Sequence, residues 1–317
     1  MLTYVSEAGV ERDERAAYRP FRAVVERITQ LSPSFVRITF SSEEFEWFAE
    51  HTLDQRVKIV FPFADGSLCD LGVDNEASLL DGSWYADWRA LPDAERNPFR
   101  TYTARAVRPA EREVDIEFVV HGDGGPAARW VMGTAVGDQV LIVGPDARSI
   151  HSAGGIDWHP GDATELLLAG DETAAPAICG ILEKLPAGSR ARAFIEVPTE
   201  LDARHIESAA DITVTWIGRD GDPTRLEDAV RDWTATNTPV FAAAIAAERQ
   251  VVDEIDIDTQ LLWDSPVEAS GPFYAWLAGE SAIIKALRRH LVSELGIDRK
   301  RVAFMGYWRL GKSENVG

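Results

Sequence analysis

The sequence predicts a two-domain protein, an antiparallel β-barrel of six strands followed by an α/β domain with a parallel sheet. The length of 317 residues exceeds that of one typical domain. In the first half of the chain, short runs alternate apolar and polar residues, which is typical of antiparallel strands. From Thr164 onward, apolar runs alternate with helical patterns, which predicts a parallel sheet with helices on both faces.

The first domain begins with a predicted hairpin, because Phe21–Ile28 and Phe35–Phe40 flank the turn residues Ser32-Pro33-Ser34. Six short strands and one helix suit a small closed barrel. The long segment 64–97 interrupts these strands, and we expect it to be a mobile flap anchored by Trp84 and Trp88. The remaining expected elements are strands Val57–Phe63, Phe99–Val107, Val114–His121 and Gln139–Val143, and a helix near Ala127–Gly133.

Glycine and proline residues cluster between Val143 and Thr164, which places the domain boundary there. We expect an N-terminal tail at 1–18, the barrel domain at 19–150, a linker at 151–163 and the α/β domain at 164–317. The sequence of the acidic segment Glu248–Pro272 predicts neither a strand nor a helix. The expected strands are Glu165–Gly170, Ala191–Val197, Ile212–Ile217, Val240–Ala244, Phe273–Ala278 and Val302–Tyr307, and the expected helices are Ala174–Leu185, Arg225–Trp233 and Ser281–Leu295.

Charge and composition exclude several classes of protein. A net charge of −20 repels nucleic acid and anionic lipid, so neither is an expected partner. No apolar run approaches the ~20 residues that span a membrane, and the acidic stretch Met1–Tyr18 does not read as a secretory signal. The 2 cysteines are too few for a disulfide framework or a four-cysteine iron–sulfur cluster. We therefore expect a cytoplasmic monomer.

The stretch from Arg100 to Trp130 carries the clearest ligand-binding pattern. Arg100 and Tyr102 alternate on a predicted strand and therefore share a face, with a cation for a phosphate and a ring for a flat heterocycle. Pro126 follows a glycine cluster and suits the first turn of a helix, whose free N–H groups attract anions. An Arg-x-Tyr-Thr pattern alone is most often an exposed strand. Combined with the helix start, it indicates a flavin dinucleotide site.

Two strand-to-helix turns in the second domain lie where α/β sheets bind ligands. The first is Gly170-Asp171-Glu172-Thr173, which also reads as an ordinary helix start with Asp171 or Thr173 as N-cap. The second follows Trp276 and precedes a helix with Lys285, Arg288 and Arg289 on one face, a pattern that most often marks a solvated surface. The histidines show no metal-ligand spacing and no Gly-x-Ser-x-Gly elbow occurs, so neither a metal site nor a nucleophile is predicted.

These motifs together resemble the siderophore-interacting proteins, the ferric-siderophore reductase branch of the ferredoxin-reductase superfamily. The resemblance rests on the Arg-x-Tyr-Thr pattern, the strand ending in histidine and the Gly-Pro-Ala-Ala-x-Trp helix start, and it extends from about residue 20 to residue 312. Further matching motifs are Asp54–Lys58, Gly170–Thr173, Trp276–Glu280 and Tyr307–Arg309. The resemblance implies that the barrel binds FAD and that the second domain binds NADPH or NADH.

The resemblance also implies roles for individual residues. Arg100 and the backbone N–H groups of Gly125 to Ala128 would hold the pyrophosphate, and Tyr102 with Thr103 would contact the isoalloxazine. The turn at Asp171 would face flavin and nicotinamide. The expected cofactor-binding residues are Arg100, Thr101, Tyr102, Thr103, Val119, His121, Gly125, Pro126, Ala127, Ala128, Asp171, Glu172 and Thr173.

The same resemblance places the ferric siderophore against the basic side chains Lys58, Arg148 and Arg289. Two positions depart from the family pattern. Ala128 stands where serine is frequent, which removes a hydroxyl contact to phosphate, and Asp146 stands where the family favours arginine. We therefore expect weaker flavin binding and poorer recognition of a strongly anionic chelate.

The expected function is an FAD-dependent reductase that passes electrons from NAD(P)H, or another donor, through FAD to Fe(III) in a ferric siderophore and releases Fe(II). The chemistry is carried by FAD, so no catalytic side chain is expected. Two alternatives stay open at this point. One is a flavin-dependent reductase that serves another electron acceptor, and the other is a protein that binds a siderophore without reducing it.

Overall fold

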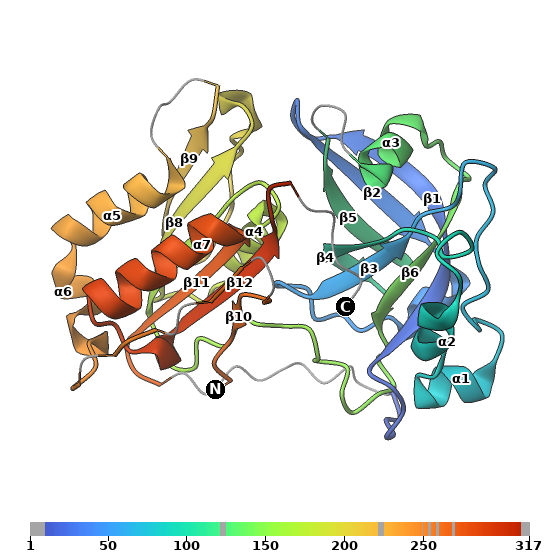
Figure 1. Ribbon diagram of the computed structural model, residues 1–317, viewed down its shortest axis with the longest axis horizontal. Helices are drawn as coiled ribbons and strands as arrows, with labels where there is room; N and C mark the ends of the chain where they lie inside the picture. Colours follow the sequence, from blue (N-terminus) through green and yellow to red (C-terminus); the bar gives the residue numbers. More distant parts are fainter. Residues whose placement is uncertain are drawn as a thin grey trace. The chain divides into compact units, whose positions relative to one another are not determined.

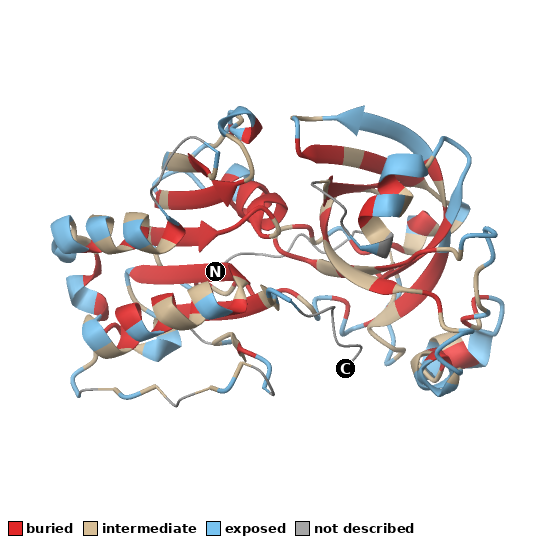
Figure 2. Cartoon of the chain, turned by 45° about the horizontal axis from the view of Figure 1, so that its top comes forward, coloured by how far each residue is buried: buried red, intermediate tan, exposed pale blue. Residues whose placement is uncertain are grey.

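The computed structural model describes residues 10–120, 125–220, 225–248, 250–252, 255–257, 260–267 and 270–311. The chain forms two compact units, the first ending at Ile156 and the second beginning at Asp157 (Figure 1). Figure 2 shows that the strands of each unit carry most of the buried residues. Within the described ranges, every helix is too short or too polar to cross a membrane.

The first unit is a closed barrel in which each strand pairs with its neighbours in antiparallel fashion. The strand order β1-β2-β5-β4-β3-β6 confirms the predicted six-stranded barrel. Closure pairs every strand on both sides, so the barrel leaves no open sheet edge. The strands are β1 (Tyr18–Gln30), β2 (Phe35–Ser41), β3 (Arg56–Val60), β4 (Phe99–Arg108), β5 (Glu113–Val119) and β6 (Gln139–Pro145).

The barrel core follows from the period-2 alternation of its strands. Val57 and Ile59 on β3 point inward and are fully buried, whereas Lys58 between them points outward. Helix α3 (Pro126–Gly133) packs on this core through Val131 and Trp130, and the Trp130 ring lies 5.2 Å from that of Phe61. The start of α3 is therefore held on the barrel by its own apolar side chains.

The segment 64–97 is not an open loop but forms two short helices, α1 (Glu76–Asp81) and α2 (Trp84–Ala90). Trp84 and Trp88 of α2 are buried in a second apolar cluster, on residues that point out of the barrel. The Trp88 ring lies 4.2 Å from that of Phe99, the first residue of β4. The predicted flap is thus packed onto the barrel over its helical half, and its movement stays a prediction.

The second unit contains a six-stranded sheet in the order β10-β12-β11-β7-β8-β9. Only the short edge strand β10 is antiparallel to its neighbour, which confirms the predicted, mostly parallel sheet. Helices α5 (Leu226–Thr236) and α7 (Ser281–Arg288) share one apolar core with the sheet, and α4 (Ala175–Lys184) also packs on it. The strands are β7 (Glu165–Gly170), β8 (Arg190–Val197), β9 (Asp211–Gly218), β10 (Trp263–Asp264), β11 (Phe273–Glu280) and β12 (Val302–Trp308).

One predicted strand of this unit is a helix, and one predicted helix is confirmed with a change of helix type in its second half. The expected strand Val240–Ala244 is helical, with α6 at Thr238–Phe241 followed by a 3-10 turn at Ala242–Ala244. Pro239 suits the first turn of a helix, and a short apolar run does not distinguish strand from buried helix. The expected helix Ser281–Leu295 is regular only to Arg288 and continues as a π-helical segment, Arg289–Glu294.

We expect Trp88→Ala to destabilise the barrel unit by about 3–5 kcal/mol, because it removes a fully buried ring that contacts Phe99. Urea unfolding followed by far-UV circular dichroism measures the change. Leu80→Ala on α1 is the matched control, since Leu80 is 42% exposed and its loss should cost less than ~0.5 kcal/mol. Equal effects of the two substitutions would contradict the packing of α2 on the barrel.

Candidate functional site

Strand β4 presents Arg100 and Tyr102 on the same side, as the alternation predicts. The Tyr102 ring is half-buried and rests against Phe118, with ring centroids 4.7 Å apart. The Arg100 guanidinium donates a hydrogen bond of 2.6 Å to the carbonyl oxygen of Phe99, and no acidic partner is recorded for it among the described residues. This strand therefore offers a cation without a counter-ion and, two residues away, a partly open aromatic ring.

The other residues of the motif point to the opposite side of β4. Thr101 accepts a hydrogen bond of 3.0 Å from the Nζ of Lys58 on the neighbouring strand, and Thr103 is buried. Val119 is half-buried at the end of β5. His121 lies outside the described residues, so its predicted place beside the flavin stays a prediction. The structure thus separates Arg100 and Tyr102 from the two threonines.

Helix α3 begins without a capping side chain. Gly125 is the exposed N-cap residue, and a Cβ atom added to it would meet no atom of the described residues within 4 Å. Pro126 opens the helix, and the first N–H groups that follow have no partner within it. Ala128 is buried, so its methyl group lies on the packed side of the helix. An anion can therefore approach this helix start closely.

These features of the barrel unit fit FAD. The pyrophosphate requires cations and N–H donors, which Arg100 and the start of α3 supply. Among the described residues, no carboxylate is seen to occupy these groups. The isoalloxazine requires a flat contact, which the exposed part of the Tyr102 ring can supply.

The three predicted substrate-docking residues have different surroundings. Lys58 and Arg148 belong to the barrel unit, and Arg289 belongs to the second unit. Arg148 donates two side-chain hydrogen bonds, of 2.9 and 2.7 Å, to the buried carboxylate of Asp146 and lies over the Trp47 ring. Its charge is therefore largely offset by the acidic residue that departs from the family pattern. The Arg289 side chain is 72% exposed and lies 3.6 Å from Glu294.

In the second unit, the buried carboxylate of Asp171 joins the ends of three parallel strands. It follows β7 and accepts hydrogen bonds from the backbone N–H of Glu280, at the end of β11, and the indole N–H of Trp308, at the end of β12, each 2.7 Å long. It also accepts bonds from the N–H and hydroxyl of Thr173, of 2.9 and 2.5 Å. Gly279 has a φ of +148°, and a Cβ atom there would lie 2.6 Å from Asp171 Oδ2.

This arrangement corrects the simpler interpretation of the turn as a capped helix start. The N-cap of α4 is Ala174, without a side-chain capping bond. One oxygen of the Asp171 carboxylate bonds Thr173 in the turn before the helix, and the other bonds the neighbouring strands. Glu172 is also buried, and Arg219 donates two hydrogen bonds of 2.7 Å to its carboxylate. Arg219 follows β9 and could not be linked to Glu172 from the sequence, because the contact depends on the order of the strands.

Burial, with the negative charge of Glu172 beside it, raises the pKa of Asp171 to about 6. The Arg219 guanidinium also contacts Glu196, whose carboxylate accepts a hydrogen bond of 2.9 Å from the N–H of Leu226 at the start of α5. The carboxylates of Asp171 and Glu172 therefore bind other parts of this unit. Through its bonds Asp171 positions the backbone at Glu280 and the Trp308 ring, which is 37% exposed.

Family models match both units. A model described as the siderophore-interacting FAD-binding domain matches residues 24–149, and one described as siderophore-interacting protein matches residues 163–311. An uncharacterized protein of Mycobacterium tuberculosis is 31% identical over 95% of this chain and 94% of its own length. The ferric vibriobactin reductase ViuB of Vibrio cholerae is 27% identical over 90% of this chain and 88% of its own length.

Solved structures with the same fold include two proteins named for siderophore interaction or use. The siderophore-interacting protein SipS from Aeromonas hydrophila has a TM-score of 0.61 and 28% identity, covering 93% of this chain and 94% of that one. A siderophore utilization protein from T. fusca shares the fold at 22% identity, with a TM-score of 0.65 and coverage of 95% and 96%. The ferredoxin reductase of carbazole 1,9a-dioxygenase shares it at 13% identity and a TM-score of 0.55, covering 92% and 70%.

The raised pKa of Asp171 makes a testable contribution to the pH dependence of stability. The folded protein keeps a proton on Asp171 at pH values where the unfolded chain, with a pKa of 3.8, has lost it. The resulting contribution to the free energy of unfolding is fully present below pH 3.8 and is lost as the pH rises through about 6. Asp171→Asn cannot titrate, so the wild type should lose stability relative to the variant over this range. Urea midpoints between pH ~4 and ~7 measure the difference, and a constant difference would contradict the shift.

Proposed function

Because this chain belongs to the siderophore-interacting protein family and carries its FAD-binding domain, we propose that it is a ferric-siderophore reductase. In this proposal NADPH or NADH donates electrons, FAD binds to the barrel unit, and Fe(III) in a siderophore accepts the electrons. The similarity to the ferric vibriobactin reductase ViuB supports this reaction class. The reduced Fe(II) has a lower charge, so hard oxygen chelators hold it less tightly and it can leave.

The proposal depends on one observation in the barrel unit. The Arg100 guanidinium has no acidic partner among the described residues, and the start of α3 in the same unit has no side-chain cap. When bound, FAD supplies the conversion of a two-electron hydride donor into single-electron transfers. Arg100 and the N–H groups from Gly125 to Ala128 would bind its pyrophosphate. Tyr102 would orient the ring system, and Trp130 and Val131 would hold the helix in place.

The chelate must approach a chain with a net charge of −20, so local cations decide which chelates bind. Lys58 is half-buried and is held by Thr101, one residue from Arg100, so it is the proposed contact in the barrel unit. Arg148 contributes less because Asp146 offsets its charge. Arg289 stays a predicted contact. A neutral or weakly charged ferric chelate is therefore the preferred substrate.

Anaerobic spectroscopy tests the function directly. The purified protein should show flavin absorbance, NADPH or NADH should bleach it, and a ferric chelate should restore it while an Fe(II)-specific dye records the product. A flavin that is reduced but not reoxidised by any of several ferric chelates would favour a different electron acceptor. A protein that binds the chelates without binding flavin would favour the non-catalytic alternative.

We expect Arg100→Ala to weaken FAD binding, because it removes a charge-assisted contact worth about 1.5–3 kcal/mol, or roughly 10- to 150-fold in affinity. Flavin occupancy after dialysis against flavin-free buffer measures the loss. Arg22→Ala on β1 is the control, since Arg22 forms an exposed ion pair with Asp74 in the same unit. Wild-type occupancy in Arg100→Ala would remove Arg100 from the site.

For substrate recognition, Lys58→Glu should raise the apparent KM of a trianionic ferric chelate at least ~10-fold, because charge reversal changes the interaction with each unit of substrate charge by ~1 kcal/mol. A neutral chelate should be little affected, and added salt should reduce the difference. Lys300→Glu, the same charge change at an exposed position of the second unit, is the control. Equal losses on both chelates would instead indicate damage to folding or flavin binding.

A further inference from the structure

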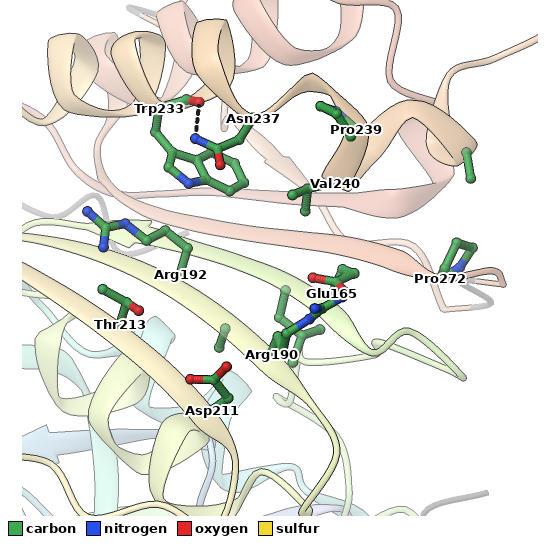
Figure 3. A pocket seen from close by; sticks show the side chains of 13 residues that line it. Glu165, Arg190, Arg192, Asp211, Thr213, Trp233, Asn237, Pro239, Val240 and Pro272 are labelled. Carbon is green, nitrogen blue, oxygen red and sulfur yellow. Dashed lines mark hydrogen bonds and ion pairs between the residues drawn. The ribbon is translucent and has the colours of Figure 1, made fainter.

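The second unit contains a cleft of about 770 Å³ at the edge of the sheet where β7, β8 and β9 begin (Figure 3). The sheet supplies a polar floor with Arg190, Arg192 and Thr213. The end of α5, together with α6 and the 3-10 turn after it, supplies a largely apolar wall that includes Trp233 and Val240. This volume is within the range of small-molecule sites.

The cleft lies far from the turn at Asp171, although both adjoin β7. Glu165, which lines the cleft, is the first residue of β7, whereas Asp171 follows its last residue, Gly170. Five residue steps along a strand amount to roughly 17 Å. The cleft is therefore at the opposite edge of the sheet from the strand ends that Asp171 joins, and it is separate from the proposed nucleotide site.

Arg192 is the residue that distinguishes this cleft. Its recorded partners are both neutral: its Nη2 donates a hydrogen bond of 2.7 Å to the Thr215 hydroxyl, and its guanidinium lies 4.6 Å from the centroid of the Phe194 ring. Its Nε is buried and has no hydrogen-bond partner. Burial lowers the pKa of the guanidinium, and no carboxylate is recorded as its partner in the described part of the chain.

The absence of a counter-ion is informative because acidic side chains are abundant here, 52 against 32 basic ones. Arg190, the other arginine that lines the cleft, is paired with Glu165. Partial burial of an unpaired cation costs stability, so a role in folding does not explain Arg192. A ligand that supplies the missing anion does explain it.

The surroundings of Arg192 define the chemistry of that ligand. Figure 3 shows the indole of Trp233 across the cleft from the Arg192 side chain, and the indole packs near the rings of Phe194 and Phe241, with centroids 6.4 and 6.5 Å away. A planar ring can pack on the indole while a carboxylate pairs with the guanidinium. Asp211 on the floor adds a negative charge, which disfavours a second anionic group on the ligand. We propose that this cleft binds a small aromatic monocarboxylate through Arg192 and Trp233.

Ligand-observed NMR and calorimetry on the FAD-loaded protein test the proposal with benzoate, benzamide and inorganic phosphate. Benzoate should bind to the wild type, and Arg192→Met, which keeps the side-chain stem but removes the charge, should weaken it at least ~10-fold. Benzamide, which is neutral, and phosphate, which lacks a ring, should bind more weakly than benzoate. Arg299→Met is the matched control and should bind benzoate like the wild type, because it also removes one arginine charge from the second unit but Arg299 is 54% exposed and does not line the cleft.

A second measurement separates a ligand contact from a structural role. Removing an uncompensated cation should leave the unfolding temperature of Arg192→Met unchanged or higher than that of the wild type, whereas a structural arginine would lower it. No benzoate binding up to ~10 mM, or equal benzoate affinity in wild type and Arg192→Met, would overturn the proposal. Phosphate binding as tight as that of benzoate would also overturn it, because the ring would then contribute nothing.

Discussion

Compensation of charge inside each unit is the constraint on which this structure most depends. A charged group removed from water costs several kcal/mol unless hydrogen bonds or an opposite charge replace its hydration. Asp171 meets this requirement with four donors, and Glu172 meets it with the two-bond contact to Arg219. Because those donors come from different strands, the requirement also holds the ends of β7, β11 and β12 in register. Stability and site geometry therefore have the same cause in this unit.

The exceptions to this constraint are as informative as the rule. Within the described residues, Arg100 and Arg192 are both recorded without an acidic partner, although the chain carries an excess of carboxylates. An unpaired guanidinium in an acidic protein is a place where a ligand can supply the anion. For Arg100 the helix start of α3 and the Tyr102 ring indicate a dinucleotide, and for Arg192 the Trp233 wall indicates a smaller acid.

The same constraint explains why Arg148 offers little uncompensated positive charge. Asp146 is buried, and Arg148 donates two side-chain hydrogen bonds to it, so Asp146 neutralises the charge of Arg148. The barrel unit consequently presents fewer uncompensated positive charges than the family pattern implies. In a chain with a net charge of −20, that difference weakens the attraction of a highly anionic chelate more than that of a neutral one.

The sequence by itself determined the fold class and most elements, because the periods of 2 and 3.6 residues are local properties that each segment carries wherever it lies. It also placed Arg100 and Tyr102 on one face of a strand, for the same reason. It misjudged Val240–Ala244, whose short apolar run is compatible with either type of element. It could not show that the carboxylates of Asp171 and Glu172 are hydrogen-bonded to other parts of the unit, and their roles in cofactor binding stay predictions. Asp171, Glu172 and Arg192 each have a hydrogen-bond partner on a strand or turn distant in the sequence, namely Trp308, Arg219 and Thr215. Only the order in which the strands assemble decides which charges meet and which stay unpaired.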